Sequence, residues 1–462
     1  MMTRDEARAI LKLPEEEAID VILDLAAKAE RDEKADVFRP KDSEPGPTTP
    51  SGMKPVYLKP PGKKRKRKPG QKKGHKGVSR PRPEKIDHYK EHTICNCPDC
   101  NNKLGNSIKS YKRYTEEIPP VEVEVTEHTV YGYWCSGCKK IVYAKITDAL
   151  SNSALGLRLV VFTAWLHYFI GVSVNNIIKL LGVVARFKVS AGGLTQAWKN
   201  LACLLYPVYD KIGNTVAKVA VLHADETGWR INGKTHWLWC FASKYLCYYI
   251  IDKSRGSPVV KKVLGKIFNG ILCCDFWGAY NRLKAWAKQR CLYHLFTEFL
   301  KIDKRNNSSA WKAFRKKLSR LLKDAIRLFE KKENELQDEK RNVARFYERL
   351  DLLLEFNSDD KDVKRLIKRL RRHRNEIFTF LEFDGVSPYN NYSEQNVRGP
   401  VITRKISHQN RSDAGAKTQA VLMSLFKSAV IQKLNPVDVV LDMAKKHIDK
   451  NISIKNELKM CA

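Results

Sequence analysis

The sequence predicts an α/β protein of several domains. Between residues 216 and 280, three apolar runs of strand length are separated by turn residues, and a helical stretch and a fourth apolar run follow them. Residues 295–380 are instead rich in charged and helix-forming residues. The chain has 462 residues, 43% of them hydrophobic, which is enough for about two to four domains. Continuous apolar runs are typical of central strands that are buried on both faces.

The charge balance constrains the partner. The chain carries 85 Lys and Arg against 51 Asp and Glu, a net charge of +34. Such an excess favours a polyanion, because each neutralised phosphate releases a counterion. We expect double-stranded DNA and no membrane, since the apolar stretch 155–174 is interrupted by Arg158 and His167. The first residues lack the apolar segment of a signal peptide, which predicts a cytoplasmic location. The 12 Cys residues are then expected to be metal ligands or core residues, not disulfides.

The N-terminal 90 residues divide into two parts. Residues 1–36 carry an apolar helical stripe, which predicts an N-terminal helix that either forms a coiled coil or packs on its own chain. Residues 37–90 form a basic linker rich in Pro and Gly, too polar to fold alone. Its centre is a continuous basic run that we expect to contact DNA phosphates: Lys63, Lys64, Arg65, Lys66, Arg67 and Lys68. A solubilising tether and a nuclear-import signal would have the same composition.

Paired cysteines predict a zinc ribbon over residues 91–146. One Cys-x-x-Cys pair is Cys97 and Cys100, and the other is Cys135 and Cys138. Two such knuckles can complete a tetrahedral Zn²⁺ site of structural type. Between them, residues 121–125 alternate in polarity as a strand does. Cys95 is a spare thiol that could replace Cys97 in the site.

A helical segment is predicted over residues 150–212. Residues 174–182 resemble the first helix of a helix-turn-helix, and residues 190–198 could begin the second. A purely structural helical bundle explains the same pattern equally well.

Two aspartates follow apolar runs of the predicted sheet. Asp225 follows the run 219–222, and Asp275 follows the run 271–274, which a helix over 258–268 precedes. Strand ends are a usual place for functional groups in α/β sheets. Either aspartate alone could simply cap a helix. Glu226 should point to the opposite face of the strand from Asp225 and is left out of the candidate site.

A third acid, Glu394, is predicted to lie on a short helix. Ser387-Pro388 would begin this helix and Gly399-Pro400 would end it. Asn391, Glu394 and Arg398 would then share one face, as a metal ligand flanked by supporting groups. The alternative is a surface Glu394–Arg398 pair. His294 could bind a metal or orient the site, although many such histidines are core residues.

Carboxylates on separate rigid elements can together hold hard divalent ions. Asp225, Asp275 and Glu394 therefore predict a site for Mg²⁺ (or Mn²⁺), and its place on a basic chain suggests phosphodiester chemistry on nucleic acid.

These motifs, taken in order, resemble the IS66-type family of bacterial insertion-sequence DDE transposases. The resemblance rests on the N-terminal helix, the linker motif at 68–77, the zinc ribbon, the helical segment, and three acidic motifs. The acidic motifs are Asp225-Glu226-Thr227, Asp275 with Gly278 and Tyr280, and Asn390-Asn391-Tyr392-Ser393-Glu394 leading to Arg398. Two departures are Tyr389, where the family usually has an acid, and Leu295-Phe296-Thr297, where it often carries Arg.

The resemblance implies an RNase H-like catalytic domain over residues 216–430, with an α-helical insertion at about 296–380 and a C-terminal tail at 431–462. It also implies Mg²⁺-dependent DNA strand cleavage and strand transfer at the ends of a mobile element, with Asp225, Asp275 and Glu394 as the catalytic triad. A homo-oligomer on nucleoid DNA and accessory proteins of the same element would be its partners. The alternatives are a catalytically decayed or recruited zinc-ribbon DNA-binding protein, and a structure-selective nuclease of the same fold.

Overall fold

The computed structural model describes residues 81–332, 339–407 and 410–448. The predicted N-terminal helix and the basic run Lys63–Lys68 lie outside these residues. At the centre is a mixed five-stranded sheet in the order β5-β4-β3-β6-β7. Its strands are β3 (Val221–Ile231), β4 (Lys234–Ala242), β5 (Cys247–Asp252), β6 (Ile267–Cys274) and β7 (Lys284–Arg290). Strands β3, β4 and β5 pair antiparallel, whereas β6 pairs parallel with both β3 and β7. The predicted α/β class is confirmed.

Helices surround the sheet and continue beyond both of its ends. Those before and within the sheet are α3 (Leu157–Trp165), the π-helical turn η3 (Leu166–Ile170), α4 (Val174–Val184), α5 (Ala191–Leu204), α6 (Tyr206–Val216), α7 (Ser257–Leu264) and the 3₁₀ turn η4 (Gly278–Tyr280). Those after it are α8 (Leu292–Asp303), α9 (Ser309–Lys332), α10 (Glu339–Leu354), α11 (Lys361–Arg372), the 3₁₀ turn η5 (Arg374–Glu376), α12 (Thr379–Glu382), α13 (Asn391–Ser407), α14 (Asp413–Ile431) and α15 (Pro436–Ile448).

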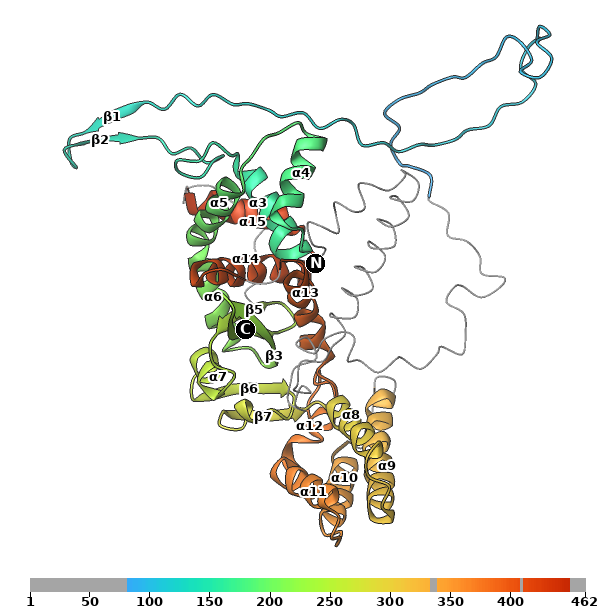
Figure 1. Cartoon of the computed structure of the whole chain (residues 1–462), viewed down its shortest axis with the longest axis vertical. Helices are drawn as coiled ribbons and strands as arrows, with labels where there is room; N and C mark the ends of the chain where they lie inside the picture. Colours follow the sequence, from blue (N-terminus) through green and yellow to red (C-terminus); the bar gives the residue numbers. More distant parts are fainter. Residues whose placement is uncertain (1–80, 333–338, 408–409, 449–462) are drawn as a thin grey trace, which may run out of the picture.

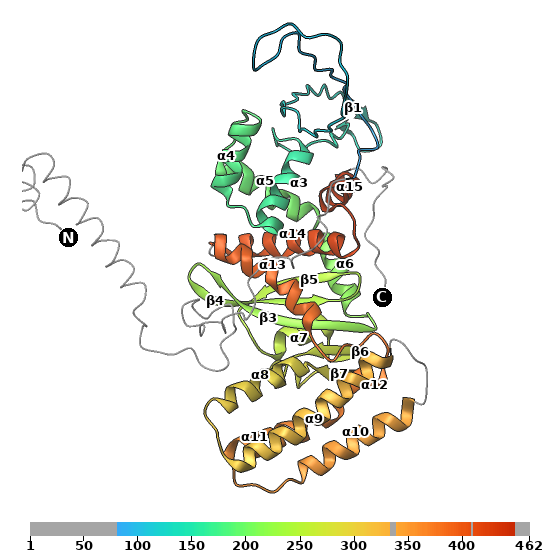
Figure 2. The same cartoon turned by 90° about the vertical axis from the view of Figure 1, so that its right-hand side faces the viewer.

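Two groups of helices lie on opposite sides of the sheet. Figures 1 and 2 both place α3, α4, α5 and α15 on one side of it along the long axis and α8–α12 on the other. Helix α13 packs on β3 and β4, and α14 packs on β5. The helices of the segment 150–212 bury their apolar residues in the same core cluster as the sheet.

The second half of strand β6, residues 271–274, is apolar because both of its faces are covered. Leu272 and Cys274 belong to the core cluster shared with α3–α6 and α13–α15. Ile271 and Cys273, which alternate with them, belong to a second cluster built by the helices α8–α12. Alternate residues of a strand point to opposite faces, so the two clusters lie on opposite sides of the sheet.

Strand β5 is an edge strand whose free backbone groups are satisfied by a helix. The N–H of Cys247 donates to Ser428 Oγ at 3.0 Å, and the N–H of Tyr249 donates to Ser424 Oγ at 2.9 Å. Both serines lie on α14 and are fully buried. Covering the edge in this way removes an exposed template for pairing with another chain. The opposite edge, β7, was not predicted, because the apolar stretch of Lys284–Arg290 is only three residues long, Ala285-Trp286-Ala287, and lies between charged residues.

Several predicted elements differ in extent. Helix α7 ends at Leu264, not at residue 268, because Gly265 has a positive φ of 75° and terminates it. The alternating stretch 121–125 is not a strand: it has no hydrogen-bonded partner and its residues are exposed. The predicted tail at 431–462 contains α15, whose Val440 and Ala444 are fully buried in the main core.

Helix α13 differs most from its prediction. It begins at Asn391 and runs through Gly399-Pro400 to Ser407, so the predicted stop is wrong. Pro400 has no N–H to donate to the carbonyl of Asn396, which normally costs a helix one hydrogen bond. Here the Tyr249 hydroxyl donates to that carbonyl at 2.7 Å. The helix continues because the sheet supplies the missing donor.

Within the described ranges, no helix combines the length and the apolar character that crossing a membrane would require.

Candidate active site and cysteine knuckles

The register of two parallel strands brings Asp225 and Asp275 to the same level. Strand β3 pairs with β6 so that His223 lies opposite Cys273. Both aspartates lie two residues beyond this pair, on neighbouring strands. Asp275 directly follows the end of β6, as predicted, whereas Asp225 lies in the middle of β3, so the prediction that it ends a strand is wrong. Strand β3 continues because β4 pairs with it beyond this point, with Asp225 opposite Cys240.

Asp225 occupies the sheet face that the helices α8–α12 cover. Val221 packs against the cluster of those helices, and residues of β3 at even spacing from it share its face, while Asp275 follows the end of the neighbouring strand β6. Glu226 takes the other face, where its carboxylate accepts hydrogen bonds from Arg255 and, at 2.8 Å, from the Tyr280 hydroxyl. Burial raises the pKa of Glu226 to about 7, and the nearby Asp275 adds to this, while Arg255 and Tyr280 oppose it.

Glu394 reaches the site from the first turn of α13. Its backbone N–H donates to Asn390 O at 3.2 Å, which fixes the start of the helix. An acid in the first turn also interacts favourably with the helix dipole. The Oε1 atom of Glu394 is buried and has no hydrogen-bond partner among the described residues. A buried carboxylate oxygen that accepts no hydrogen bond is a suitable ligand for a cation.

Asn390 ties the three parts of the site together and was not predicted. Its side-chain amide donates to Ala224 O at 2.9 Å, and its Oδ1 lies 3.1 Å from His223 Nδ1. Its backbone N–H donates to Cys291 Sγ at 3.2 Å. Asn390 is 1% exposed, whereas the predicted supporting residue Asn391 is exposed. The Asn-Asn pair in the sequence marks this position, and its buried member is Asn390, not the predicted Asn391.

Arg398 was also predicted as a supporting residue. It is exposed, and the structure gives it no contact with Glu394. The predicted i, i+3, i+7 face of Asn391, Glu394 and Arg398 therefore contributes one residue to the site, because the inward face of α13 is that of Ser393, Asn396 and Val397.

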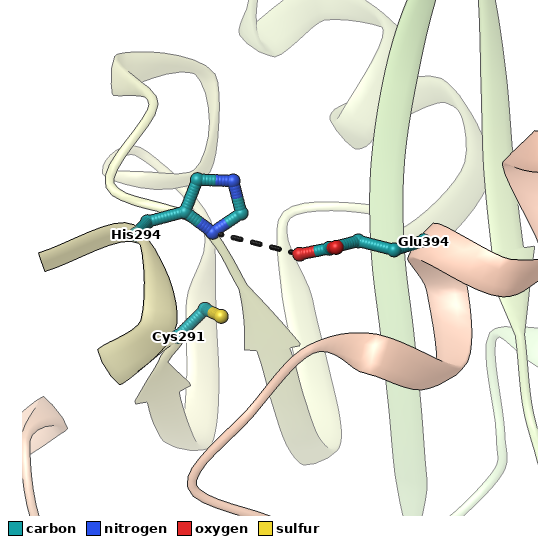
Figure 3. A group of neighbouring side chains, drawn as sticks. All are labelled: Cys291, His294 and Glu394. Atoms are coloured by element: carbon teal, nitrogen blue, oxygen red, sulfur yellow. Dashed lines mark ion pairs between the residues drawn. The ribbon is translucent and has the colours of Figure 1, made fainter. Parts of the chain in front are cut away.

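His294, which could bind a metal or orient the site, lies beside Glu394. Its Nδ1 is 3.7 Å from Glu394 Oε1, and Figure 3 shows the ring and the carboxylate facing each other from α8 and α13. Burial lowers the pKa of His294, but Cys291, Asp275 and Glu394 outweigh burial and raise it to about 9. The imidazolium therefore partly balances the acids of the site.

The two aspartates repel each other. Burial raises the pKa of Asp225 well above its ordinary value, and the charges of Glu226 and Asp275 raise it further. Crowded buried carboxylates require a counter-charge to ionise together, which a divalent cation supplies. The carboxylate oxygens of Asp225, Asp275 and Glu394, all of which the structure describes, do not all lie within 4.8 Å of one another. Two ions held about 4 Å apart would use carboxylates spread over such a wider span.

A buried arginine holds Asp275 in place. Arg290 is fully buried, and its guanidinium donates to Asp275 O at 2.7 Å and to Glu376 at 2.6 Å. On the other side, Asp275 Oδ1 accepts the N–H of Trp277 at 2.9 Å. Trp277 in turn stacks on Arg255, whose guanidinium carbon is 4.0 Å from the ring centre. Arg290 thus fixes the backbone of Asp275, and the Trp277 N–H orients its carboxylate.

The four predicted zinc ligands lie on two separate turns. Backbone hydrogen bonds from Cys100 and Asp99 lower the pKa of Cys97, and the same contacts from Cys138 and Gly137 lower that of Cys135. Cys135 ends β1 (Gly132–Cys135), which pairs with β2 (Lys140–Tyr143). N–H groups directed at sulfur are the geometry of a metal knuckle. The structure does not bring the two pairs into one cluster, and Figure 1 places β1 and β2 at the far end of an extended path.

Comparison with known families agrees with this arrangement. A family model described as "Transposase IS66 family" matches residues 152–418, which is more than half of the chain and includes all three acids. A second model, described as "zinc-finger binding domain of transposase IS66", matches residues 95–139, which include both cysteine pairs. No curated protein matches the chain. With the sheet, the acids and the knuckles in the expected order, the chain belongs to the IS66 family of transposases.

Proposed function

We propose that this transposase binds the ends of its element and cleaves and joins DNA strands with Mg²⁺ (or Mn²⁺) held by Asp225, Asp275 and Glu394. The observation that carries the proposal is the register of β3 and β6. It sets Asp225 and Asp275 level on neighbouring strands, while Asn390 fastens the start of α13, and with it Glu394, to the same strand. We propose that this sheet is the core of the RNase H-like domain expected from the family resemblance, and that α8–α12 are its helical insertion.

The residues present suit hard divalent ions. The set offers carboxylate oxygens, and Glu394 Oε1 is buried without a partner. When bound, such ions activate the attacking oxygen and stabilise the leaving oxygen of an in-line phosphoryl transfer. In the first step, water attacks the phosphorus at the element end and the 3′-oxygen leaves with a proton as a 3′-hydroxyl. In the second, that hydroxyl attacks a target phosphodiester, and the target's own 3′-oxygen leaves.

Other parts of the chain would hold the DNA. Helix α11 buries Val363, Leu366 and Leu370 and exposes Lys361 and Lys368, so its outer face is basic. We assign phosphate contact to this face, to the linker run Lys63–Lys68, and to the zinc ribbon over 91–146, where Zn²⁺ on Cys97, Cys100, Cys135 and Cys138 would close the fold.

Helices α4 and α5 match the two helices of the predicted helix-turn-helix in extent, and Ser173 and Ser190 cap them. Pairing of two DNA ends would require a homo-oligomer in the cytoplasm, with accessory proteins of the element as further partners.

Cleavage of the flanking DNA tests this proposal. The substrate is a duplex that carries the DNA on either side of this gene, and the protein is compared with its Glu394→Gln variant. The matched control is Gln395→Ala, since Gln395 is the exposed neighbour on the same turn. We expect Mg²⁺-dependent cutting at a defined end, lost in Glu394→Gln and kept in Gln395→Ala. Specific binding without cutting would favour a non-catalytic DNA-binding protein. Equal cutting of element ends and random duplexes would favour a structure-selective nuclease.

A further inference from the structure

We propose that Cys291, His294 and Glu394 form a binding site for one Zn²⁺-like ion, separate from the cysteine knuckles. This is the one group of three metal-ligating side chains in the described residues whose ligand atoms all lie within 4.8 Å of one another. Figure 3 shows the three side chains converging from the start of α8 and from α13. The cysteine and the histidine are three residues apart, which places them on one face of a helical turn.

The distances fit a tetrahedral ion after a small adjustment. His294 Nδ1 and Glu394 Oε1 are 3.7 Å apart. Bonds of about 2.0 Å to nitrogen and oxygen give an N···O separation of roughly 3.3 Å around tetrahedral Zn²⁺, and a bond of about 2.3 Å to sulfur gives separations of roughly 3.5 Å. The 3.7 Å between His294 Nδ1 and Glu394 Oε1 would therefore shorten by a few tenths of an ångström on binding. Three protein ligands would leave a fourth position for water.

The chemistry of the three ligands distinguishes this site from the Mg²⁺ site. A thiolate and an imidazole are soft or borderline ligands that favour Zn²⁺ or Co²⁺ over Mg²⁺, which takes oxygen ligands. Binding would displace the thiol proton of Cys291 and the proton of His294 Nδ1 to solvent, leaving a thiolate and a neutral imidazole.

The surroundings hold the ligands in place. The N–H of Asn390 donates to Cys291 Sγ at 3.2 Å, and the N–H of Cys291 donates to Cys274 O at 2.9 Å. The N–H of Leu292 donates to Pro388 O at 2.9 Å, which fastens the start of α8 to the segment before α13. Hydrogen bonds to ligand atoms of this kind orient a metal site. Glu394 Oε1, which has no such bond, is free to accept a metal.

One consequence rests on the proposed function. Glu394 belongs to both sites, so an ion held with Cys291 and His294 would withdraw an oxygen from the Mg²⁺ set. Zn²⁺ would then inhibit strand cleavage in competition with Mg²⁺.

Cobalt titration tests the site without reference to activity. The full chain is first loaded with one equivalent of zinc, which the four cysteine thiolates of the knuckles take in preference to a site of three ligands, and is then titrated with Co²⁺. We expect one further equivalent to bind, with the near-ultraviolet band of a thiolate–cobalt bond. Cys291→Ser should abolish that band, and His294→Ala should weaken binding by at least about tenfold. The control is Cys203→Ser, an exposed thiol on α5 that should leave the titration unchanged.

The His294→Ala variant serves as a second test in case Cys291→Ser misfolds, because His294 is part-exposed whereas Cys291 is buried. Binding of no further cobalt, or a thiolate band that survives in Cys291→Ser, would overturn the site. Zinc inhibition of cleavage is then compared in the wild type and in His294→Ala, where its midpoint should rise at least about tenfold. Should the protein cut no DNA, the proposed function fails, while the cobalt result still decides the metal site.

Discussion

At the scale of single residues, the site depends on a buried amide as much as on its acids. Asn390 bonds β3 through Ala224 O and His223, and it contacts Cys291 at the start of α8. It therefore sets the distance between Glu394 and the strand that carries Asp225. Its neighbour Asn391 has the same chemistry and is exposed, so it provides a natural comparison.

We expect Asn390→Ala to lower stability by about 1–3 kcal/mol, because it leaves Ala224 O buried without a donor. The cutting rate should fall by more than the loss of folded protein explains, because Glu394 loses its fixed position. Thermal unfolding and the Mg²⁺-dependent cutting rate measure the two effects. Asn391→Ala should match the wild type in both. Equal effects of the two substitutions would show that Asn390 does not position Glu394.

The sequence indicated which acids to consider but not how their neighbours are arranged. Asp275 follows an apolar strand as predicted, and His294 lies beside Glu394. The choice of Asn391 over Asn390 failed because it depended on where α13 begins, and helix starts are uncertain from sequence. Asp225 was placed at a strand end because the apolar run stops there. The strand continues through partners on β4, which lie far away in the sequence.

At the scale of elements, α13 shows how tertiary contacts overrule local signals. Gly399-Pro400 is a strong stop in sequence terms, yet the Tyr249 hydroxyl takes the carbonyl that Pro400 leaves free. A hydroxyl on β5 was not available to any argument from the local pattern. Helix existence in residues 295–380 was predictable from charge and periodicity, while the edge strand β7 was not, because its residues lack an apolar pattern.

A double-mutant cycle tests this substitution of donors. Tyr249→Phe should destabilise the wild type by about 1–3 kcal/mol, because the carbonyl of Asn396 loses its donor. In a Pro400→Ala background the same change should cost less than half as much, because the helix N–H of the new alanine replaces the hydroxyl. Urea unfolding of the four proteins gives the coupling energy. A cost that is equal in both backgrounds would show that Tyr249 does not serve Pro400.

The contact between η5 and β7 predicts an acid-sensitive element. Burial raises the pKa of Glu376, but His373 and Arg290 outweigh it and lower the pKa to about 2 from its ordinary 4.5. A carboxyl whose folded pKa is lowered stabilises the fold fully above about pH 4.5, and this contribution is lost as the pH falls toward 2. Glu376→Gln should therefore be strongly destabilised at pH 7, and its deficit should shrink between pH 5 and 3. Urea unfolding across that range measures it, and a deficit independent of pH would refute the pairing.

At the scale of the whole molecule, the five-stranded sheet and the cysteine knuckles are separate in the chain. The zinc-finger match covers residues 95–139, and the larger match starts at residue 152. The structure describes the knuckles as two turns joined by an extended segment without regular structure. Their closure into one site would depend on the ion, because small metal domains gain their folding free energy from metal binding.

Loss of zinc should therefore remove DNA binding and leave the sheet folded. We expect Cys135→Ser to release the knuckle zinc and weaken binding to element ends by at least about tenfold. Its far-ultraviolet circular dichroism should stay close to that of the wild type. Cys95→Ser, which changes the spare thiol, is the matched control. If Cys95→Ser lost the zinc and a Cys97→Ser variant kept it, Cys95 would be the zinc ligand in place of Cys97.

The central claim is that three distant carboxylates hold divalent ions together, and Mn²⁺ binding tests it most directly. Electron paramagnetic resonance of free Mn²⁺ gives the number and affinity of bound ions for the zinc-loaded protein, with Gln395→Ala as the control. We predict that Asp225→Asn, Asp275→Asn and Glu394→Gln each lose at least one ion or weaken its binding by about tenfold or more, and that Gln395→Ala matches the wild type. Wild-type Mn²⁺ binding in all three variants would contradict the claim.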